Sequence, residues 1–196
     1  MPILQWCPTG AFTFLPIHAA GRYNPCSDEG AIECASDYFI STYVPTIGTL
    51  LAHPPPPSTK KYKMMVVIQS SKLPSTRQEL KHIQKHVPST SLVIFGVPGA
   101  VADVEAVAAH LAHSSIVHFA CHGKQDHMKP LNSGLTLHDG LLKVSRIMKE
   151  KIPSGTLAFL CACETAVGDQ KLPDEAMNLG ASFLFSGFRR VVATMW

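Results

Sequence analysis

Two apolar runs of the sequence end on residue types that can carry out nucleophilic chemistry. The run that begins at Ile116 closes at His122 and Gly123, and a second run ends 41 residues after the histidine, at Cys163. A thiol becomes a strong nucleophile as its thiolate, and a neighbouring imidazole can take the proton or stabilise the ion pair. The two residues therefore predict a Cys-His catalytic pair.

Gly123 indicates where the negative charge of such a reaction would be held. A glycine has no Cβ atom, so its backbone can turn sharply and bring its N–H group close to a ligand. We expect the N–H groups of Gly123 and Cys163 to donate to a developing oxyanion.

Cys161 is the alternative nucleophile, because it would face the same way as Cys163 in an ideal strand. Cys163 is favoured, since it is the last residue before a polar turn, whereas Cys161 is followed by Ala162 within the apolar run. A free cysteine inside a strand usually acts as a small hydrophobe, and Cys121 has the same structural interpretation. His118 is interpreted as a histidine of the core or of a sheet face.

A metal site is the rival chemistry for these cysteines and histidines. Structural zinc sites normally pair their ligands as Cys-x2-Cys or His-x3-5-His. The close cysteines are separated by one residue, and the adjacent Cys121 and His122 would point to opposite faces of a strand. His118 and His122 have a suitable gap, but on a strand they need not converge. The sequence therefore predicts no metal and no cofactor.

Apolar strands and amphipathic helices alternate from Lys63 onward, which predicts an α/β fold with a mostly parallel sheet and helices on both faces. In such a sheet, chemistry collects at the carboxyl ends of the strands, where His122 and Cys163 lie. An all-antiparallel sheet would contradict this prediction. The expected neighbouring strands are Met64–Ile68, Leu92–Phe95, Ser115–Ala120 and Thr156–Cys161.

The helix patterns carry their own start and stop signals. Ser75 and Gln78 have the spacing of a capping box at the start of STRQELKHIQKHV. PDEAMNLGASFLFSG has Pro173 in its first turn and Gly187 after its last. LLKVSRIMKE is expected to form a further helix. The stretch GVPGAVAD lacks the G-x-G start of a nucleotide-binding fingerprint, so it predicts an ordinary turn from strand to helix.

The chain divides near a run of prolines. Residues 54–61 predict a proline-rich linker, and residues 62–196 predict the core. Residues 1–53 are too short for a comfortable core of their own, so we expect this N-terminal segment to pack on the larger part. Otherwise it would expose an apolar cluster of Phe12, Phe14, Leu15 and Ile17.

The composition narrows the class of protein. The chain has 196 residues, 46% of them hydrophobic, a formal net charge of +3 and only 16% charged residues. No basic stripe points to nucleic acid, and no run is long enough to predict a membrane span. Six cysteines, several inside apolar runs, predict reduced thiols. We expect a cytoplasmic protein that has neither nucleic acid nor a membrane as its partner.

Several long, collinear stretches resemble the CHAT domain, a caspase-like module related to separases. They are HFACHG, LNSGLTLHDGLL, LAFLCACETAVGD and LPDEAMNLGASFLFSGFRRVVATMW, with WCPTGAFTFLPIHAAGRY and STYVPTIGTLL upstream. The resemblance implies a caspase-like three-layer sandwich in which His122 is the general base or ion-pair partner and Cys163 the nucleophile. The family usually continues beyond the TMW motif, so the core is expected to be truncated at its C-terminal end.

The resemblance implies a CHAT-type cysteine endopeptidase that cuts a protein substrate as an effector in a signalling or defence pathway, behind an upstream repeat or sensor module. The alternative is a catalytically silent interaction or signalling module with the same fold. Acidic residues at the strand edge would favour a basic side chain before the cut bond. Candidates for this contact are Asp139, Glu164 and Asp169, although Asp139 and Gly140 equally predict a hairpin turn. Residues 132–139 are expected in a surface hairpin beside the active site.

Overall fold

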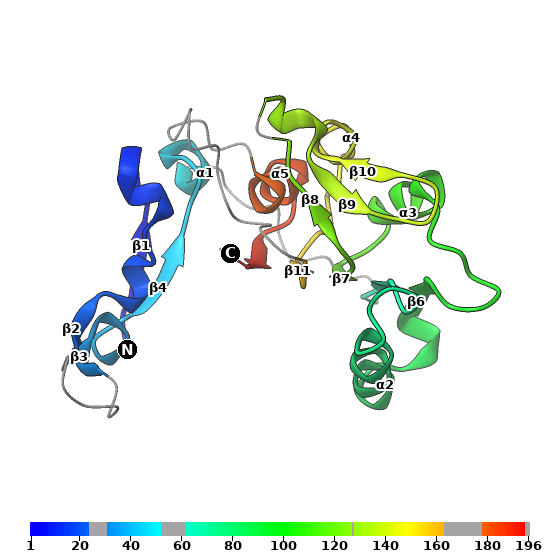
Figure 1. The fold of residues 1–196 in the computed structure, drawn as a ribbon, viewed down its shortest axis with the longest axis horizontal. Helices are drawn as coiled ribbons and strands as arrows, with labels where there is room; N and C mark the ends of the chain where they lie inside the picture. Colours follow the sequence, from blue (N-terminus) through cyan, green and yellow to red (C-terminus); the bar gives the residue numbers. More distant parts are fainter. Residues whose placement is uncertain (24–30, 52–61, 127, 163–177, 195–196) are drawn as a thin grey trace. The chain divides into compact units, whose positions relative to one another are not determined.

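The computed structural model describes residues 1–23, 31–51, 62–126, 128–162 and 178–194 of the chain (Figure 1). These residues belong to two compact units: a smaller one with the described residues up to 51, and a larger one with those from 62 onward. Among the described residues, no helix has the length and apolar content that a membrane crossing requires.

The smaller unit is built from short strand pairs. β1 (Ile3–Trp6) pairs in parallel with β4 (Ile40–Tyr43), and β2 (Gly21–Tyr23) pairs in antiparallel fashion with β3 (Ala31–Cys34). Its helices are the 3-10 turns Gly10–Phe14, Ile17–Ala19 and Ala35–Asp37 and the short α1 (Ile47–Leu51). No side chain described in this unit is fully buried. The packing of this segment on the larger part stays a prediction.

The larger unit contains the expected parallel sheet (Figure 1). Its five strands lie in the order β12-β11-β7-β5-β6, and every neighbouring pair is parallel. The strands are β5 (Met64–Ile68), β6 (Leu92–Phe95), β7 (Ile116–Ala120), β11 (Leu157–Leu160) and β12 (Arg190–Ala193). The four strands predicted from apolar runs are thus confirmed, with the histidine-bearing β7 in the middle of the sheet.

Helices cover both faces of this sheet, because successive strand residues point to opposite sides. On one face, α3 (Val104–Leu111), α4 (Val144–Ile147) and α5 (Leu179–Ser186) contribute to a large core that contains Val117 and Phe119 of β7. On the other face, Leu80 of α2 (Thr76–His86) packs with Val66 and Ile68 in a smaller core. This arrangement is a caspase-like α/β fold.

The turn between β6 and α3 depends on two glycines. Gly96 and Gly99 have φ angles of 85° and 84°, and Val97 and Ala100 form an isolated bridge between them. Such φ values favour glycine, since a Cβ atom makes them costly. A Cβ atom on Gly96 would lie 1.8 Å from the carbonyl oxygen of Ile68. The stretch is thus the predicted turn from strand to helix.

A small antiparallel sheet lies between β7 and β11 in the sequence. It contains β8 (Gly123–Lys124), β9 (Gly134–Thr136) and β10 (Leu141–Lys143) in the order β10-β9-β8. The hairpin predicted around residues 132–139 is therefore present, but it is not purely a surface element, because Leu135 and Leu142 are fully buried. The helix expected from Leu141 is wrong at its start: residues 141–143 pair with β9, and α4 begins only at Val144.

The ends of α2 and α5 test the start and stop signals that the sequence predicted. The side chain of Ser75 makes no capping hydrogen bond to α2, so the predicted capping box is wrong. Asn178 caps α5, since its Oδ1 accepts the N–H of Ala181 at 2.8 Å. The predicted stop is confirmed, because Gly187 follows α5 with a φ of 120°. The predicted first turn at Pro173 lies outside the described residues.

Candidate functional site

His122 lies at the carboxyl end of β7, two residues after its last residue, Ala120. Its side chain is exposed, whereas the preceding Cys121 is buried. Two backbone contacts hold this position: the N–H of His122 donates to Oε1 of Gln69 at 3.2 Å, and its carbonyl accepts the N–H of Thr136 at 2.7 Å. The histidine is therefore fixed between the end of β5 and the hairpin, with its imidazole free to reach solvent.

Gly123 follows in β8, where it lies opposite Leu135 of β9. Pairs in an antiparallel ladder alternate between hydrogen-bonded and non-hydrogen-bonded. Thr136 donates to His122, so the next pair, Gly123 with Leu135, is a non-hydrogen-bonded one. The N–H of Gly123 consequently points away from β9, as an oxyanion donor must. The chain is extended here, so the sharp turn expected at this glycine does not occur.

The second half of the predicted pair follows β11 in the sequence. β7 and β11 are parallel neighbours, with Phe119 opposite Leu160. The chain continues through Cys161, whose N–H donates to the carbonyl of Phe119 at 2.8 Å, and through the buried Ala162. Cys163, Glu164 and Asp169, three of the predicted site residues, lie outside the described residues.

Asp139 has a contact that the sequence did not indicate. It lies in the turn of the β9–β10 hairpin, and its Oδ1 accepts the N–H of Val104 at 2.8 Å, in the first turn of α3. The adjacent His138 contacts Asp103, the residue before α3, at 3.1 Å. The carboxylate of Asp139 thus caps a helix from a neighbouring element, and its predicted role towards substrate stays a prediction.

A cavity of about 280 Å³ lies beside the His122 position. Gln69, Cys121 and Thr136 contribute to its wall, so it opens next to the residues that hold and precede the histidine. Lys72 and His138 also line it, and no carboxylate is among its lining residues, all of them described. A cavity at this edge of a parallel sheet is a natural place for a substrate side chain.

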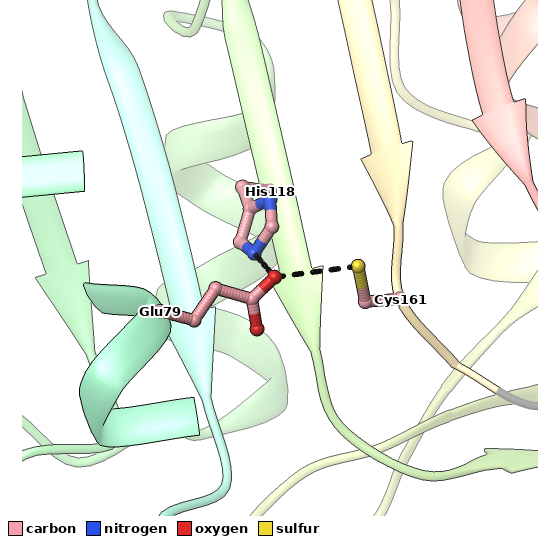
Figure 2. Close-up of side chains that lie close together, drawn as sticks. All are labelled: Glu79, His118 and Cys161. Atoms are coloured by element: carbon pink, nitrogen blue, oxygen red, sulfur yellow. Dashed lines mark hydrogen bonds and ion pairs between the residues drawn. The ribbon is translucent and has the colours of Figure 1, made fainter. Parts of the chain in front are cut away.

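A second group of reactive side chains lies on the face of the sheet that α2 covers (Figure 2). Nε2 of His118 on β7 is 3.1 Å from Oε1 of Glu79 on α2. The thiol of Cys161, just after β11, donates to the same oxygen at 3.4 Å. His118 also stacks on Phe159, with ring centroids 5.3 Å apart. His118 is buried, as predicted for a sheet-face histidine, but its acidic partner was not foreseen.

The electrostatics of this group oppose nucleophilic chemistry. Burial, followed by the nearby Glu79 carboxylate, raises the pKa of the Cys161 thiol to about 12. Burial also raises the pKa of Cys121 to about 12, with a smaller contribution from Cys161. Burial lowers the pKa of His118, although the negative charge of Glu79 acts in the opposite direction. At neutral pH both cysteines are therefore thiols, and His118 is a neutral imidazole.

Sequence reasoning missed two of these residues, Gln69 and Glu79. Gln69 follows β5 directly, so the rule that chemistry gathers at strand ends could have indicated it. Glu79 precedes Ile83 by four residues, which places a carboxylate on the apolar face of α2. An acidic residue within an apolar stripe was the signal for the second group.

Comparison with known families identifies the family of the chain. A family model described as the CHAT domain matches residues 4–196 of the chain. No curated protein matches it.

Proposed function

Since the chain belongs to the CHAT family of caspase-like peptidases, we propose that it is a cysteine endopeptidase whose catalytic residues are His122 and Cys163. In this proposal it is an effector that cuts a protein partner when an upstream repeat or sensor module releases it. The family match and the fold support a peptidase scaffold, and the features of His122, Gly123 and the strand register support the residue assignment.

The reaction uses the two residues in sequence. His122 takes the thiol proton of Cys163, and the thiolate attacks the carbonyl carbon of the substrate peptide bond. The N–H groups of Gly123 and Cys163 donate to the oxyanion that forms. His122 then gives the proton to the leaving amine, the C–N bond breaks, and an acyl-enzyme remains. A water molecule, deprotonated by His122, hydrolyses the thioester and restores the thiol.

The register between β7 and β11 is the observation that carries the assignment. Phe119 lies opposite Leu160, and in the sequence His122 and Cys163 each follow their member of that pair by three residues. Parallel strands that are in register end at the same edge of the sheet. The paired residues are thus in register, and the equal spacing in the sequence from each of them to His122 and to Cys163 supports the assignment of these two as a catalytic pair.

The neighbouring thiols support the choice of sulfur. A catalytic cysteine needs a depressed pKa, which requires a positive or hydrogen-bonding environment. Cys161 and Cys121 have pKa values raised to about 12, and Cys161 lies beside the carboxylate of Glu79. Neither is suited to be the nucleophile.

The side chain before the cut bond is proposed to enter the cavity beside His122. The presence of Lys72 and His138, and the lack of a lining carboxylate, favour a neutral or acidic side chain in this cavity. The competing preference for a basic side chain depends on Asp139, Glu164 and Asp169 forming the pocket. A peptide library that varies this position distinguishes the two preferences. Cleavage of peptides with neutral or acidic side chains would support the first, and cleavage of peptides with basic side chains would support the second.

The test joins the chain to its upstream module, activates it and measures peptide cleavage and labelling by a thiol-alkylating probe. His122→Ala and Cys163→Ala should each lower turnover on the order of 10³-fold or more. The two residues act as a unit, so replacing one costs nearly as much activity as replacing both. Cys161→Ala is the matched control and should retain activity. Cleavage that persists in Cys163→Ala would show that the wrong sulfur was chosen. An inert, unlabelled wild type would show instead that the chain is a silent interaction module.

A further inference from the structure

Three side chains with metal-ligating atoms converge from three elements on the α2 face of the sheet. Glu79 comes from α2, His118 from β7 and Cys161 from the residue after β11, and their ligand atoms all lie within 4.8 Å of one another (Figure 2). We propose that Glu79, His118 and Cys161 form a binding site for a divalent transition-metal cation, with Zn²⁺ as the expected occupant. The site shares no residue with the proposed catalytic pair, and the inference does not depend on the proposed peptidase activity.

The buried ring nitrogen of His118 is the first argument for a ligand. His118 is only 6% exposed, and its Nε2 has no hydrogen-bond partner of good geometry among the residues that the structure describes. Oε1 of Glu79 is near enough, at 3.1 Å, but it does not lie in the direction required for a hydrogen bond. Buried polar atoms in native proteins are almost always satisfied, so such a nitrogen requires an explanation. A cation held between the nitrogen and the carboxylate would satisfy both.

Two of the three separations between the ligand atoms are close to those in a zinc shell. Zinc binds nitrogen at about 2.0–2.1 Å, carboxylate oxygen at about 2.0–2.2 Å and sulfur at about 2.3 Å, in tetrahedral geometry. These lengths separate a nitrogen and an oxygen ligand by about 3.4 Å, and a sulfur and an oxygen ligand by about 3.6 Å. The observed separations are 3.1 Å and 3.4 Å. The third separation, from the histidine nitrogen to Sγ of Cys161, is within 4.8 Å, and the two atoms would come closer together when a metal binds.

The types of donor favour a transition metal over magnesium or calcium. Magnesium and calcium prefer shells of six or more oxygen atoms, whereas imidazole and thiolate suit zinc and its neighbours. His118 is held for this purpose by its stacking on Phe159, and its lowered pKa keeps the ring neutral, the form that binds metal. The Cys161 proton leaves when the metal binds. Three protein ligands leave one position open for water.

A cation can reach the site, and once bound it would connect three elements of the fold. The side chain of Glu79 is 36% exposed, so a cation can approach from the α2 side. A bound cation would tie α2 to β7 and β11, the strands that lead to His122 and Cys163. The sequence patterns predicted no metal because they test for ligands close together in the chain, whereas Glu79 and Cys161 are 82 residues apart.

The test is a Co²⁺ titration of the full chain carrying His122→Ala and Cys163→Ala, which removes the catalytic pair as a competing metal site. We expect one Co²⁺ per chain, with the d–d bands of a tetrahedral site and a near-ultraviolet charge-transfer band from a thiolate. Zn²⁺ should displace the cobalt and raise the Tm of the chelator-treated protein.

Variants at the three ligands identify the site. Cys161→Ser should abolish the thiolate band, and Glu79→Gln and His118→Gln should each weaken binding at least about tenfold. Cys121→Ala is the matched control, because it removes a buried thiol from the opposite core and should leave the band intact. If a variant of the buried His118 does not fold, Glu79→Gln still tests the site, because Glu79 is partly exposed and its replacement should leave the fold intact. A missing charge-transfer band, or Co²⁺ binding that is unchanged in Glu79→Gln, would overturn the proposal. Glu79, His118 and Cys161 would then be a structural group that binds no metal.

Discussion

The N–H of His122 donates to the side-chain oxygen of Gln69 across 3.2 Å, although the two residues are 53 positions apart in the chain. This contact ties the histidine loop to the end of β5 and makes Gln69 a positioning residue for the proposed reaction. Loss of one such hydrogen bond typically costs about 1 kcal/mol.

Gln69→Ala should therefore lower kcat about fivefold to tenfold, since 1.4 kcal/mol corresponds to a factor of about ten in rate. Gln69→Glu keeps an acceptor oxygen and should recover most of kcat. Steady-state kinetics on one peptide would check this. A change confined to KM in Gln69→Ala would indicate a role in the cavity, and not in positioning His122.

Gly96 and Gly99 provide a matched pair for the turn after β6, because their φ angles are nearly equal. Gly99→Ala adds only the strain of a left-handed backbone, about 1–2 kcal/mol, since nothing lies within 4 Å of its Cβ position. Gly96→Ala adds a clash with the carbonyl of Ile68 and should lose more than about 4 kcal/mol of unfolding free energy. Urea unfolding of both variants measures the difference. Equal losses would contradict the described turn.

Asp139→Ala should destabilise the chain by about 1 kcal/mol, because the first turn of α3 loses the acceptor for the Val104 N–H. That corresponds to a decrease in Tm of about 2–4 °C for a chain of this size. Asp139→Asn retains an oxygen acceptor and should lose less. Thermal unfolding measures the stability that the helix cap contributes. Peptide-library profiles of the same variants show whether Asp139 affects the choice of substrate. A changed preference with an unchanged Tm would assign Asp139 to substrate binding.

Cys161 should resist alkylation in the folded protein. Because its pKa is raised to about 12, its thiolate fraction at pH 8 is on the order of 10⁻⁴ and rises about tenfold with each pH unit. Glu79→Gln removes the neighbouring negative charge, which should lower the pKa and speed labelling. Site-resolved mass spectrometry after iodoacetamide treatment gives the rates, with the urea-unfolded chain as reference. Equal rates in folded and unfolded chains would refute the raised pKa.

Much of the sheet could be predicted from the sequence, because its strands are short apolar runs that end abruptly. Met64–Ile68 and Leu92–Phe95 form strands within the predicted runs. The two failures have different physical causes. Leu141 and Leu142 fit a helix pattern, but pairing with β9 and burial of Leu142 outweigh that local preference. The capping box at Ser75 failed because the side chain does not reach back onto its helix.

The candidate site was predictable only in part. The position of His122 followed from a strand end, which is a local signal. Its partner Gln69 and the group of Glu79, His118 and Cys161 come from segments far apart in the chain. Which of these meet depends on strand order and on how α2 crosses the sheet. A single sequence carries no direct record of either.

The central place of β7 has a consequence for the order of events during synthesis. β7 is flanked by β5, which precedes it, and by β11, which follows it after an inserted antiparallel sheet. A nascent chain that has just made His122 has only one of the two neighbours that β7 requires. Distant pairings of this kind form late, since loop closure must come first. The proposed peptidase is thus expected to stay inert on the ribosome until β11 emerges.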